Sequence, residues 1–294
     1  GTAPGLFIPH GDKVVILLPG PPRELQPMFD LVCRGPLQAR AGSERAHRAT
    51  LFITGRGESH VEQLVQPIYA RWRDRTPPIS TTILAAMGQI ELHLTGRHAD
   101  SSRAAAMLDG AVAELMAVIA DDVYSTDGRT MEEVVGDLLK SRGYTIAAAE
   151  SCTGGLLTSR LTDVAGSSAY VRASVVAYAY EDKTSLLGVP KPMIQTHGAV
   201  SEPVAVAMAE GIRARTGADV AVAITGIAGP GGGTETKPVG TVVIAVIAPD
   251  QPVYVRTYGF IGGRPMVKFQ ATQAALDRVR RMLTDAVRGL AVTS

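Results

Sequence analysis

The stretch that decides the fold is Tyr144-Thr-Ile-Ala-Ala-Ala-Glu150-Ser-Cys-Thr-Gly-Gly155-Leu-Leu-Thr-Ser-Arg-Leu-Thr162. The apolar run that ends at Ala149 predicts a buried strand, and the run from Leu156 to Thr162 predicts a helix. A polar, glycine-containing turn between a strand and a helix directs free backbone N–H groups at one point, where an anion such as phosphate can bind. Ser151, Thr153, Gly154 and Gly155 are therefore candidate substrate contacts, although an ordinary helix cap is the simpler interpretation of the turn alone.

The rest of the C-terminal half alternates helix and strand. This pattern predicts a layered α/β domain with a mixed sheet. The residues 219–225 are apolar on both faces, as a central strand covered by helices should be. The expected helices are 131–141, 156–162, 203–215 and 266–288, and the expected strands are 144–149, 174–180, 219–225, 240–248 and 253–259.

A small α+β domain is expected before it. Its predicted elements are strands at 50–54, 79–85 and 89–95 and helices at 59–71 and 102–119. The last helix has apolar residues at three- and four-residue spacing. The turn 55–58 resembles a nucleic-acid-clamping loop only superficially, because it lacks the Gly-x-x-Gly spacing. Upstream, a strand at 13–18 and a helix after Pro22 suggest the tail of a domain, and the polar stretch 40–48 is expected to be a linker or an exposed loop.

The amino-acid composition does not indicate a macromolecular binding partner. The net charge of +1 over 294 residues provides no electrostatic footprint for nucleic acid or an anionic membrane. Two cysteines are too few for a disulfide framework and suggest a reducing cytoplasm. No apolar run is long enough for a membrane span. We therefore expect a cytoplasmic protein that does not bind a membrane and is unlikely to bind nucleic acid.

Two further polar clusters follow predicted strands, where open α/β sheets usually bind ligands. Thr225 and Gly226 begin a loop rich in glycine, which permits either a close approach to a ligand or simply a sharp turn. Ser168 is followed by Tyr178 and Lys183, which together suit a nucleophile, a hydrogen-bonding phenol and an amine base. Spacing alone leaves a turn serine, a sheet tyrosine and a solvated lysine as the plainer interpretation.

The motifs together resemble those of the CinA family. They are Ala149-Glu-Ser-Cys-Thr-Gly-Gly155, Gly166-Ser-Ser168, Val175-Val-Ala-Tyr178, His197-Gly-Ala-Val-Ser-Glu-Pro203, Thr225-Gly-Ile-Ala-Gly-Pro230 and Lys237-Pro-Val-Gly-Thr241. The resemblance implies a C-terminal amidohydrolase domain at 127–294 and a KH-type middle domain at 46–126. It also implies that 1–45 is the end of a molybdopterin-binding-like domain whose earlier part is missing from the sequence.

The resemblance further implies hydrolysis of the carboxamide of nicotinamide mononucleotide, without a cofactor or metal, in a homodimer. Lys183 would deprotonate Ser168 for attack on the amide, and Tyr178 would relay or orient the proton. Thr225 would contact the substrate, Arg264 would bind its phosphate, and Cys152 would be a packed side chain. The Gly-Asp-Arg of the family reads Gly262-Gly-Arg264 here. Two alternatives remain: an ADP-ribose pyrophosphatase that depends on the missing domain, and a non-catalytic nucleotide-binding or competence-related module.

Overall fold

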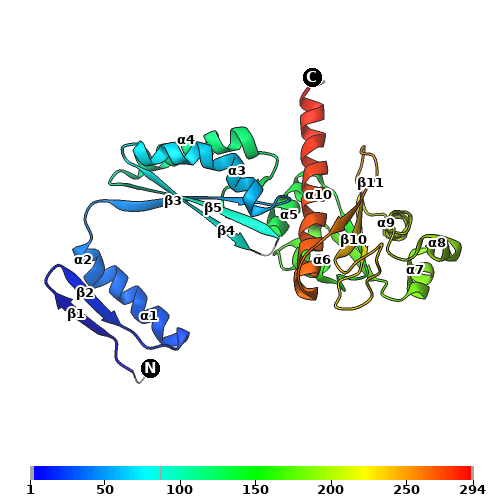
Figure 1. The fold of residues 1–294 in the computed structure, drawn as a ribbon, viewed down its shortest axis with the longest axis horizontal. Helices are drawn as coiled ribbons and strands as arrows, with labels where there is room; N and C mark the ends of the chain where they lie inside the picture. Colours follow the sequence, from blue (N-terminus) through cyan, green and yellow to red (C-terminus); the bar gives the residue numbers. More distant parts are fainter. Residues whose placement is uncertain (1–2, 87, 293–294) are drawn as a thin grey trace.

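The computed structural model describes residues 3–86 and 88–292. Three sheets follow one another along the chain, and Figure 1 shows them as successive units from the N-terminus to the long helix α10. The first unit is the hairpin β1 (Leu6–His10) and β2 (Lys13–Leu17) with helix α1 (Pro22–Val32), a short π-helical turn (Cys33–Leu37) and α2 (Gln38–Arg40). Within residues 3–40, no side chain is buried.

The second unit is a four-stranded antiparallel sheet in the order β4-β5-β3-β6. Its strands are β3 (Arg45–Ile53), β4 (Ile79–Ala86), β5 (Gln89–His98) and β6 (Val123–Ser125). Helices α3 (Glu58–Tyr69) and α4 (Ser101–Ile119) cover it, with a 3-10 turn (Ala70–Asp74) after α3. The predicted α+β character of this region is confirmed.

The C-terminal unit has a five-stranded sheet in the order β11-β10-β9-β7-β8. Its strands are β7 (Ile146–Glu150), β8 (Val171–Val176), β9 (Val220–Gly226), β10 (Thr241–Ile247) and β11 (Tyr254–Gly259). β7 is parallel to both β8 and β9, whereas β10 is antiparallel to β9 and β11. The predicted mixed sheet is therefore confirmed.

Two cores cover the two faces of this sheet. Successive strand side chains point to opposite faces, so Val222 and Ile224 of β9 pack on one side and Ala221 and Ala223 on the other. The first side is covered by α5 (Met131–Arg142), α6 (Leu156–Thr162) and α10 (Arg264–Val292). The second is covered by α7 (Tyr180–Leu187), α8 (Lys191–His197) and α9 (Glu202–Thr216). Burial on both faces explains why these strands are continuously apolar.

Several sequence-based boundaries were wrong. The stretch 40–48 was expected to be a linker or an exposed loop, but β3 begins at Arg45, which pairs with His98 of β5. The strand expected at 174–180 is β8 at Val171–Val176, and Tyr180 already belongs to α7. Short elements such as β6 and α8 were missed, because three to seven residues carry too little periodicity to identify. Within the described residues, no helix is both long and apolar enough to cross a membrane.

Candidate active site

The carboxyl ends of three neighbouring strands form the candidate site. Ser151 directly follows β7, Lys183 lies in α7 beyond the end of β8, and Thr225 lies near the end of β9. β7 lies between β8 and β9 and runs parallel to both, so these three ends meet at one edge of the sheet. This edge is where open α/β sheets bind ligands.

Lys183 and Ser151 are in direct contact at this edge. Lys183 Nζ donates to Ser151 Oγ at 3.0 Å and to the carbonyl oxygen of Ala177 at 2.8 Å. A longer contact of 3.5 Å reaches the carbonyl of Tyr178. Lys183 is 1% exposed and Ser151 is 8% exposed, so bulk water is largely excluded from the pair. The structure therefore pairs the lysine with the serine of the first turn.

Burial favours the neutral amine of Lys183. Loss of hydration lowers the pKa of Lys183 below its usual value, although the neighbouring Cys152 and Asp182 oppose the shift. A neutral amine has two N–H donors and one lone pair. In this neutral form the two donors can serve the carbonyls of Ala177 and Tyr178, and the direction of the 3.0 Å contact reverses, so that the Ser151 hydroxyl donates to the lone pair. The geometry is that of a serine activated by an amine base.

Ser168 does not join this site, and its predicted pairing with Lys183 is corrected. It lies in a 3-10 turn (Ser167–Ala169) before the first residue of β8, whereas Lys183 follows the last. A strand of six residues rises about 3.3 Å per residue, which separates its two ends by roughly 17 Å. Ser168 is exposed, and it makes no side-chain hydrogen bond within the described part of the chain. Ser168 is nearer to Lys183 along the sequence than Ser151 is, but the fold places Ser168 at the opposite edge of the sheet.

Tyr178 and Arg264 meet at the mouth of the site. Arg264, the first residue of α10, donates from Nη2 to the phenol oxygen of Tyr178 at 2.7 Å and from Nη1 to the carbonyl of Gly229 at 2.8 Å. Because the phenol oxygen accepts this bond, its own proton remains available to a ligand. Tyr178 is 57% exposed, and only its backbone carbonyl approaches Lys183. The expected relay through the phenol to Lys183 is therefore replaced by a link to Arg264.

Two glycines give the first turn its shape. Gly154 and Gly155 have φ values of 60° and 90°, in the left-handed region that glycine adopts without strain. Among the described residues, no backbone carbonyl accepts a hydrogen bond from the N–H groups of Cys152 and Thr153. The hydroxyl of Thr153 is also buried without a partner there. The turn therefore offers several donors to a ligand.

Glu150 holds this turn against helix α6, a role that the sequence analysis missed. Its buried carboxylate accepts hydrogen bonds from the N–H groups of Leu157 and Thr158, at 3.1 and 3.0 Å, and from the Thr158 hydroxyl at 2.8 Å. These contacts satisfy N–H groups of the first helical turn, where the helix dipole also favours a negative charge. The available signal was an acidic residue immediately before a glycine turn that opens a helix.

Thr225 and Gly226 are placed for packing. The Thr225 hydroxyl is buried and donates to the carbonyl of Ala199 at 2.9 Å, which ties β9 to the segment before α9. A Cβ at Gly226 would lie 2.8 Å from the carbonyl oxygen of Thr241 on β10, so this position has no room for a side chain. Both residues lie beside the Lys183–Ser151 pair at the strand ends without contacting either side chain through a hydrogen bond.

Cys152 is a packed thiol. It is 5% exposed, and burial raises its pKa to about 12. A thiol protonated at neutral pH is a poor nucleophile. The expectation that Cys152 serves as a small packed side chain agrees with this environment.

Lys268 is a second residue that the sequence analysis missed. It lies one turn after Arg264 in α10, and a Cβ built on Gly154 would lie 3.7 Å from its ammonium nitrogen. Lys268 forms no ion pair or hydrogen bond with any residue that the structure describes. A cation beside the glycine turn therefore adds positive charge to the N–H donors there. The available indication was its place four residues after Arg264, in the first turn of the helix expected at 266–288.

Comparisons with known proteins agree with this arrangement of units. The family model for the CinA C-terminal domain matches residues 128–283, and the model for the damage-inducible protein CinA KH domain matches residues 48–125. A CinA-like protein of Koribacter versatilis is 46% identical over 290 residues, which cover 96% of this chain and 68% of that protein. A CinA-like protein of Acidobacterium capsulatum is 43% identical over 288 residues, again covering 96% of this chain and 68% of the relative.

Solved structures match the C-terminal half. The competence/damage inducible protein of Agrobacterium tumefaciens is 38% identical with a TM-score of 0.51, and the match covers 52% of this chain and 93% of that one. A competence-damaged protein (CinA) superfamily member from Klebsiella pneumoniae is 34% identical, also with a TM-score of 0.51, and covers 53% of this chain and 99% of its own. The unit that carries the Lys183–Ser151 pair is therefore one that these proteins share.

Proposed function

The chain belongs to the CinA family, and from that premise we propose that it hydrolyses the carboxamide of nicotinamide mononucleotide to nicotinic acid mononucleotide and ammonia. The single observation that carries the reaction type is the buried hydrogen bond between Lys183 and Ser151. The substrate is proposed from the family resemblance of the motifs, most of which follow strand ends around this pair. Ser151 replaces Ser168 as the proposed nucleophile.

Acylation begins with transfer of the Ser151 hydroxyl proton to neutral Lys183. The Ser151 oxygen then forms a bond to the carboxamide carbon, and the carbonyl π electrons move to oxygen. Lys183, now an ammonium, returns the proton to the amide nitrogen as the C–N bond breaks. Ammonia leaves, and the pyridine carbonyl remains as an ester on Ser151.

Deacylation reverses the roles. Lys183 is neutral again and takes a proton from a water molecule that attacks the ester carbon. The bond to the Ser151 oxygen breaks, and that oxygen recovers the proton from Lys183. The product is the carboxylic acid, which releases its proton to solvent and leaves as the carboxylate, and Ser151 and Lys183 return to their starting protonation.

The N–H groups of Cys152 and Thr153 are the proposed donors to the negatively charged oxygen of the tetrahedral intermediate. They follow the nucleophile directly in the chain, and no backbone carbonyl among the described residues accepts from them. Donors fixed by the fold stabilise such an oxygen at little cost in reorganisation, and each is worth about 3 kcal/mol. The Glu150 contacts with α6 keep this turn in place.

Lys268, Arg264 and the turn at Gly154 are the proposed contacts of the nucleotide phosphate. Lys268 supplies an unpaired cation next to the glycine turn. Arg264 also orients the Tyr178 phenol through its 2.7 Å bond, which leaves the phenol proton for the ribose or the amide. Recognition of phosphate by a cation and by backbone N–H groups at a helix start follows the general pattern for anions.

One assay tests the function. Ammonia release is measured from nicotinamide mononucleotide and from free nicotinamide, with Ser151→Ala as the inactive control. We expect turnover of the mononucleotide that is lost in the variant, and far slower turnover of free nicotinamide. Undiminished release by Ser151→Ala would overturn the mechanism, and no release by the wild-type chain would overturn the activity.

A further inference from the structure

A cavity lies away from the candidate active site, between the four-stranded sheet and the C-terminal unit. Its volume is about 830 Å³, within the range of small-molecule pockets. One wall comes from the turn at Gly55 and the β4–β5 hairpin, and the other comes from β11 and α10. Ser151, Tyr178, Lys183 and Arg264 are not among its lining residues. The cavity is therefore separate from the proposed chemistry.

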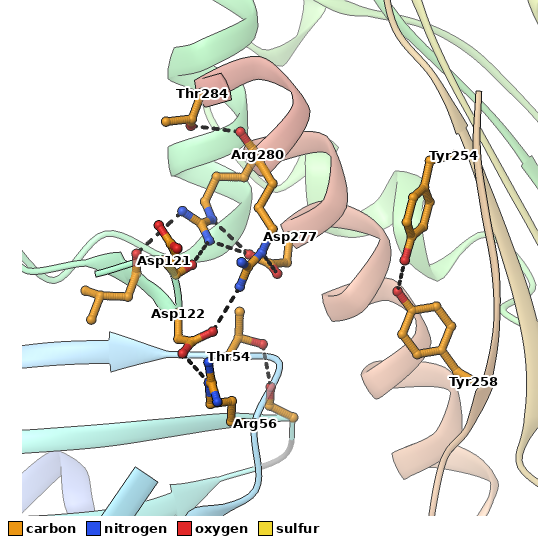
Figure 2. Close-up of polar contacts among 12 residues, drawn as sticks. Thr54, Arg56, Asp121, Asp122, Tyr254, Tyr258, Asp277, Arg280 and Thr284 are labelled. Carbon is orange, nitrogen blue, oxygen red and sulfur yellow. Dashed lines mark hydrogen bonds and ion pairs between the residues drawn. The ribbon is translucent and has the colours of Figure 1, made fainter. Parts of the chain in front are cut away.

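An ion pair and a hydrogen bond to a backbone carbonyl join the two walls, as Figure 2 shows. Asp122, after α4, pairs with Arg56 on its own unit and with Arg281 of α10 at 3.3 Å. Asp277 binds Arg281 at 2.7 Å and Arg280 at 2.8 Å, and Arg280 also donates to the carbonyl of Asp121 at 2.9 Å. Because these carboxylates are already bonded to arginines, they leave little acceptor capacity for a ligand.

The β11 wall is aromatic and cationic. Alternation along the strand places Tyr254, Arg256, Tyr258 and Phe260 on the face toward the cavity. The rings of Tyr258 and Phe260 stack with centroids 5.3 Å apart, and the Tyr254 and Tyr258 hydroxyls are 2.7 Å apart (Figure 2). The Arg256 guanidinium lies 5.1 Å from the Tyr258 ring centroid. This wall suits a planar ring that carries negative charge.

Unused hydrogen-bond capacity on the α10 wall consists of donors. Gln273 is 1% exposed, and its Oε1 accepts from Arg160 at 2.6 Å, but its Nε2 has no partner among the described residues. The guanidinium carbon of Arg278 lies 4.1 Å from the Tyr254 ring centroid. The buried Nε of Arg278 also has no hydrogen-bond partner among the described residues. Neither Arg256 nor Arg278 forms an ion pair within the described chain. A buried donor without an acceptor is costly, and an acceptor-rich ligand would remove that cost.

We propose that this interdomain cavity binds a nucleoside monophosphate. Arg256 and Arg278 bind the phosphate, Gln273 Nε2 donates to the sugar or base, and the base packs on the Tyr258 and Phe260 rings. Two guanidinium groups without ion-pair partners in the described chain suffice to bind one phosphate group. A nucleic-acid strand carries many phosphates and would need a longer row of cationic side chains. The site goes beyond the proposed amidase and uses none of its residues.

The test is isothermal titration of the full chain with adenosine monophosphate, which has no carboxamide to hydrolyse. We expect saturable binding that includes this cavity, and the affinity of the cavity should fall about tenfold in Arg256→Gln and in Arg278→Gln. Arg103→Ala, an exposed arginine on α4, is the matched control and should bind as the wild type does. Lys268→Ala removes a proposed phosphate contact of the catalytic site and should leave the binding that depends on Arg256 and Arg278 unchanged. Melting curves confirm that each variant is folded.

Photolabelling with 8-azidoadenosine monophosphate locates the site independently of the substitutions. Label on peptides of β11 or of the middle of α10 supports the proposal. Absence of binding at millimolar nucleotide overturns it, as does binding that Lys268→Ala abolishes while the two arginine variants keep it. A single-stranded 12-nucleotide DNA that binds more than tenfold tighter, with the same arginine dependence, would also overturn it in favour of nucleic acid. Ammonia release plays no part in these readouts, so the amidase can fail independently.

Discussion

Lys183 Nζ donates a hydrogen bond to Ser151 Oγ across 3.0 Å, although 32 positions separate the two residues along the chain. The contact exists because β7 and β8 are parallel neighbours whose carboxyl ends lie at one edge of the sheet. The Glu150 carboxylate fixes the turn that carries Ser151, and the carbonyls of Ala177 and Tyr178 hold the amine. A hydroxyl and an amine kept together away from water form the pairing that a serine amidase with a lysine base requires.

Ser151→Ala should reduce amide hydrolysis by about 10³-fold or more, because it removes the nucleophile of a unit whose members act together. Ser168→Ala is the matched control and should stay within about twofold of the wild type, since Ser168 lies exposed at the opposite edge of the sheet. Initial rates of ammonia release with nicotinamide mononucleotide compare the two variants. The reverse ranking would restore Ser168 as the nucleophile.

The kcat/KM of the wild-type chain should rise with pH. Only the neutral amine accepts the Ser151 proton, and burial lowers the pKa of Lys183 below its usual 10.5. The active fraction therefore increases as pH rises through this lowered pKa and levels off above it. A profile measured from pH 5 to pH 10 checks the sign. A rate that falls steadily over this interval would contradict a lysine base.

The free energy of unfolding should also rise with pH, because it depends on the protonation of Lys183. Between the lowered pKa of folded Lys183 and 10.5, the unfolded chain binds a proton that the folded chain does not. The free energy of unfolding therefore rises with pH in that window, by at most about 1.4 kcal/mol per pH unit. Lys183→Met cannot titrate and should show a flatter dependence in urea denaturation from pH 7 to pH 10. Identical slopes for the two proteins would show that Lys183 has an ordinary pKa.

Lys268→Ala should weaken use of a phosphorylated substrate. Loss of one charged hydrogen bond costs about 1.5 to 3 kcal/mol, which corresponds to a KM increase of roughly 10- to 100-fold. The rate with free nicotinamide should not change, because that substrate has no phosphate. Lys191→Ala removes an exposed lysine of α8 and serves as the control. Equal losses with both substrates would place Lys268 in the chemistry or in the packing.

Glu150→Gln should destabilise the fold by about 1 to 3 kcal/mol. The amide keeps the shape of the side chain, but it supplies one acceptor oxygen in place of two and adds an N–H₂ group with no acceptor at the helix start. Urea denaturation measures the difference. Glu181→Gln changes an exposed glutamate and should leave the midpoint almost unaltered. A stable Glu150→Gln variant would mean that the cap contributes little.

Periodicity in the sequence predicted the main elements of the C-terminal unit and the layered arrangement. The run 219–225 is apolar on both faces because helices cover both sides of β9. This pattern can be identified from consecutive residues, without knowledge of the tertiary structure. The turn at Glu150 to Gly155 was recognisable because a strand, two glycines and a helix follow one another directly. β8 and the start of β3 were misplaced, since mixed polar and apolar residues in partly exposed strands carry a weak pattern.

The sequence by itself therefore determined the layered α/β fold and a polar turn at a strand end, because both follow from neighbouring residues. Only the tertiary structure decided which serine faces Lys183. Ser151 and Ser168 both stand in turns beside short helices, but one follows a strand and the other precedes the next strand. Strand order and direction bring the end of β7 to the end of β8 and carry the start of β8 to the far edge. The sequence also left open the pairing of Asp122 with Arg281, since contacts between units depend on how two separately folded surfaces meet.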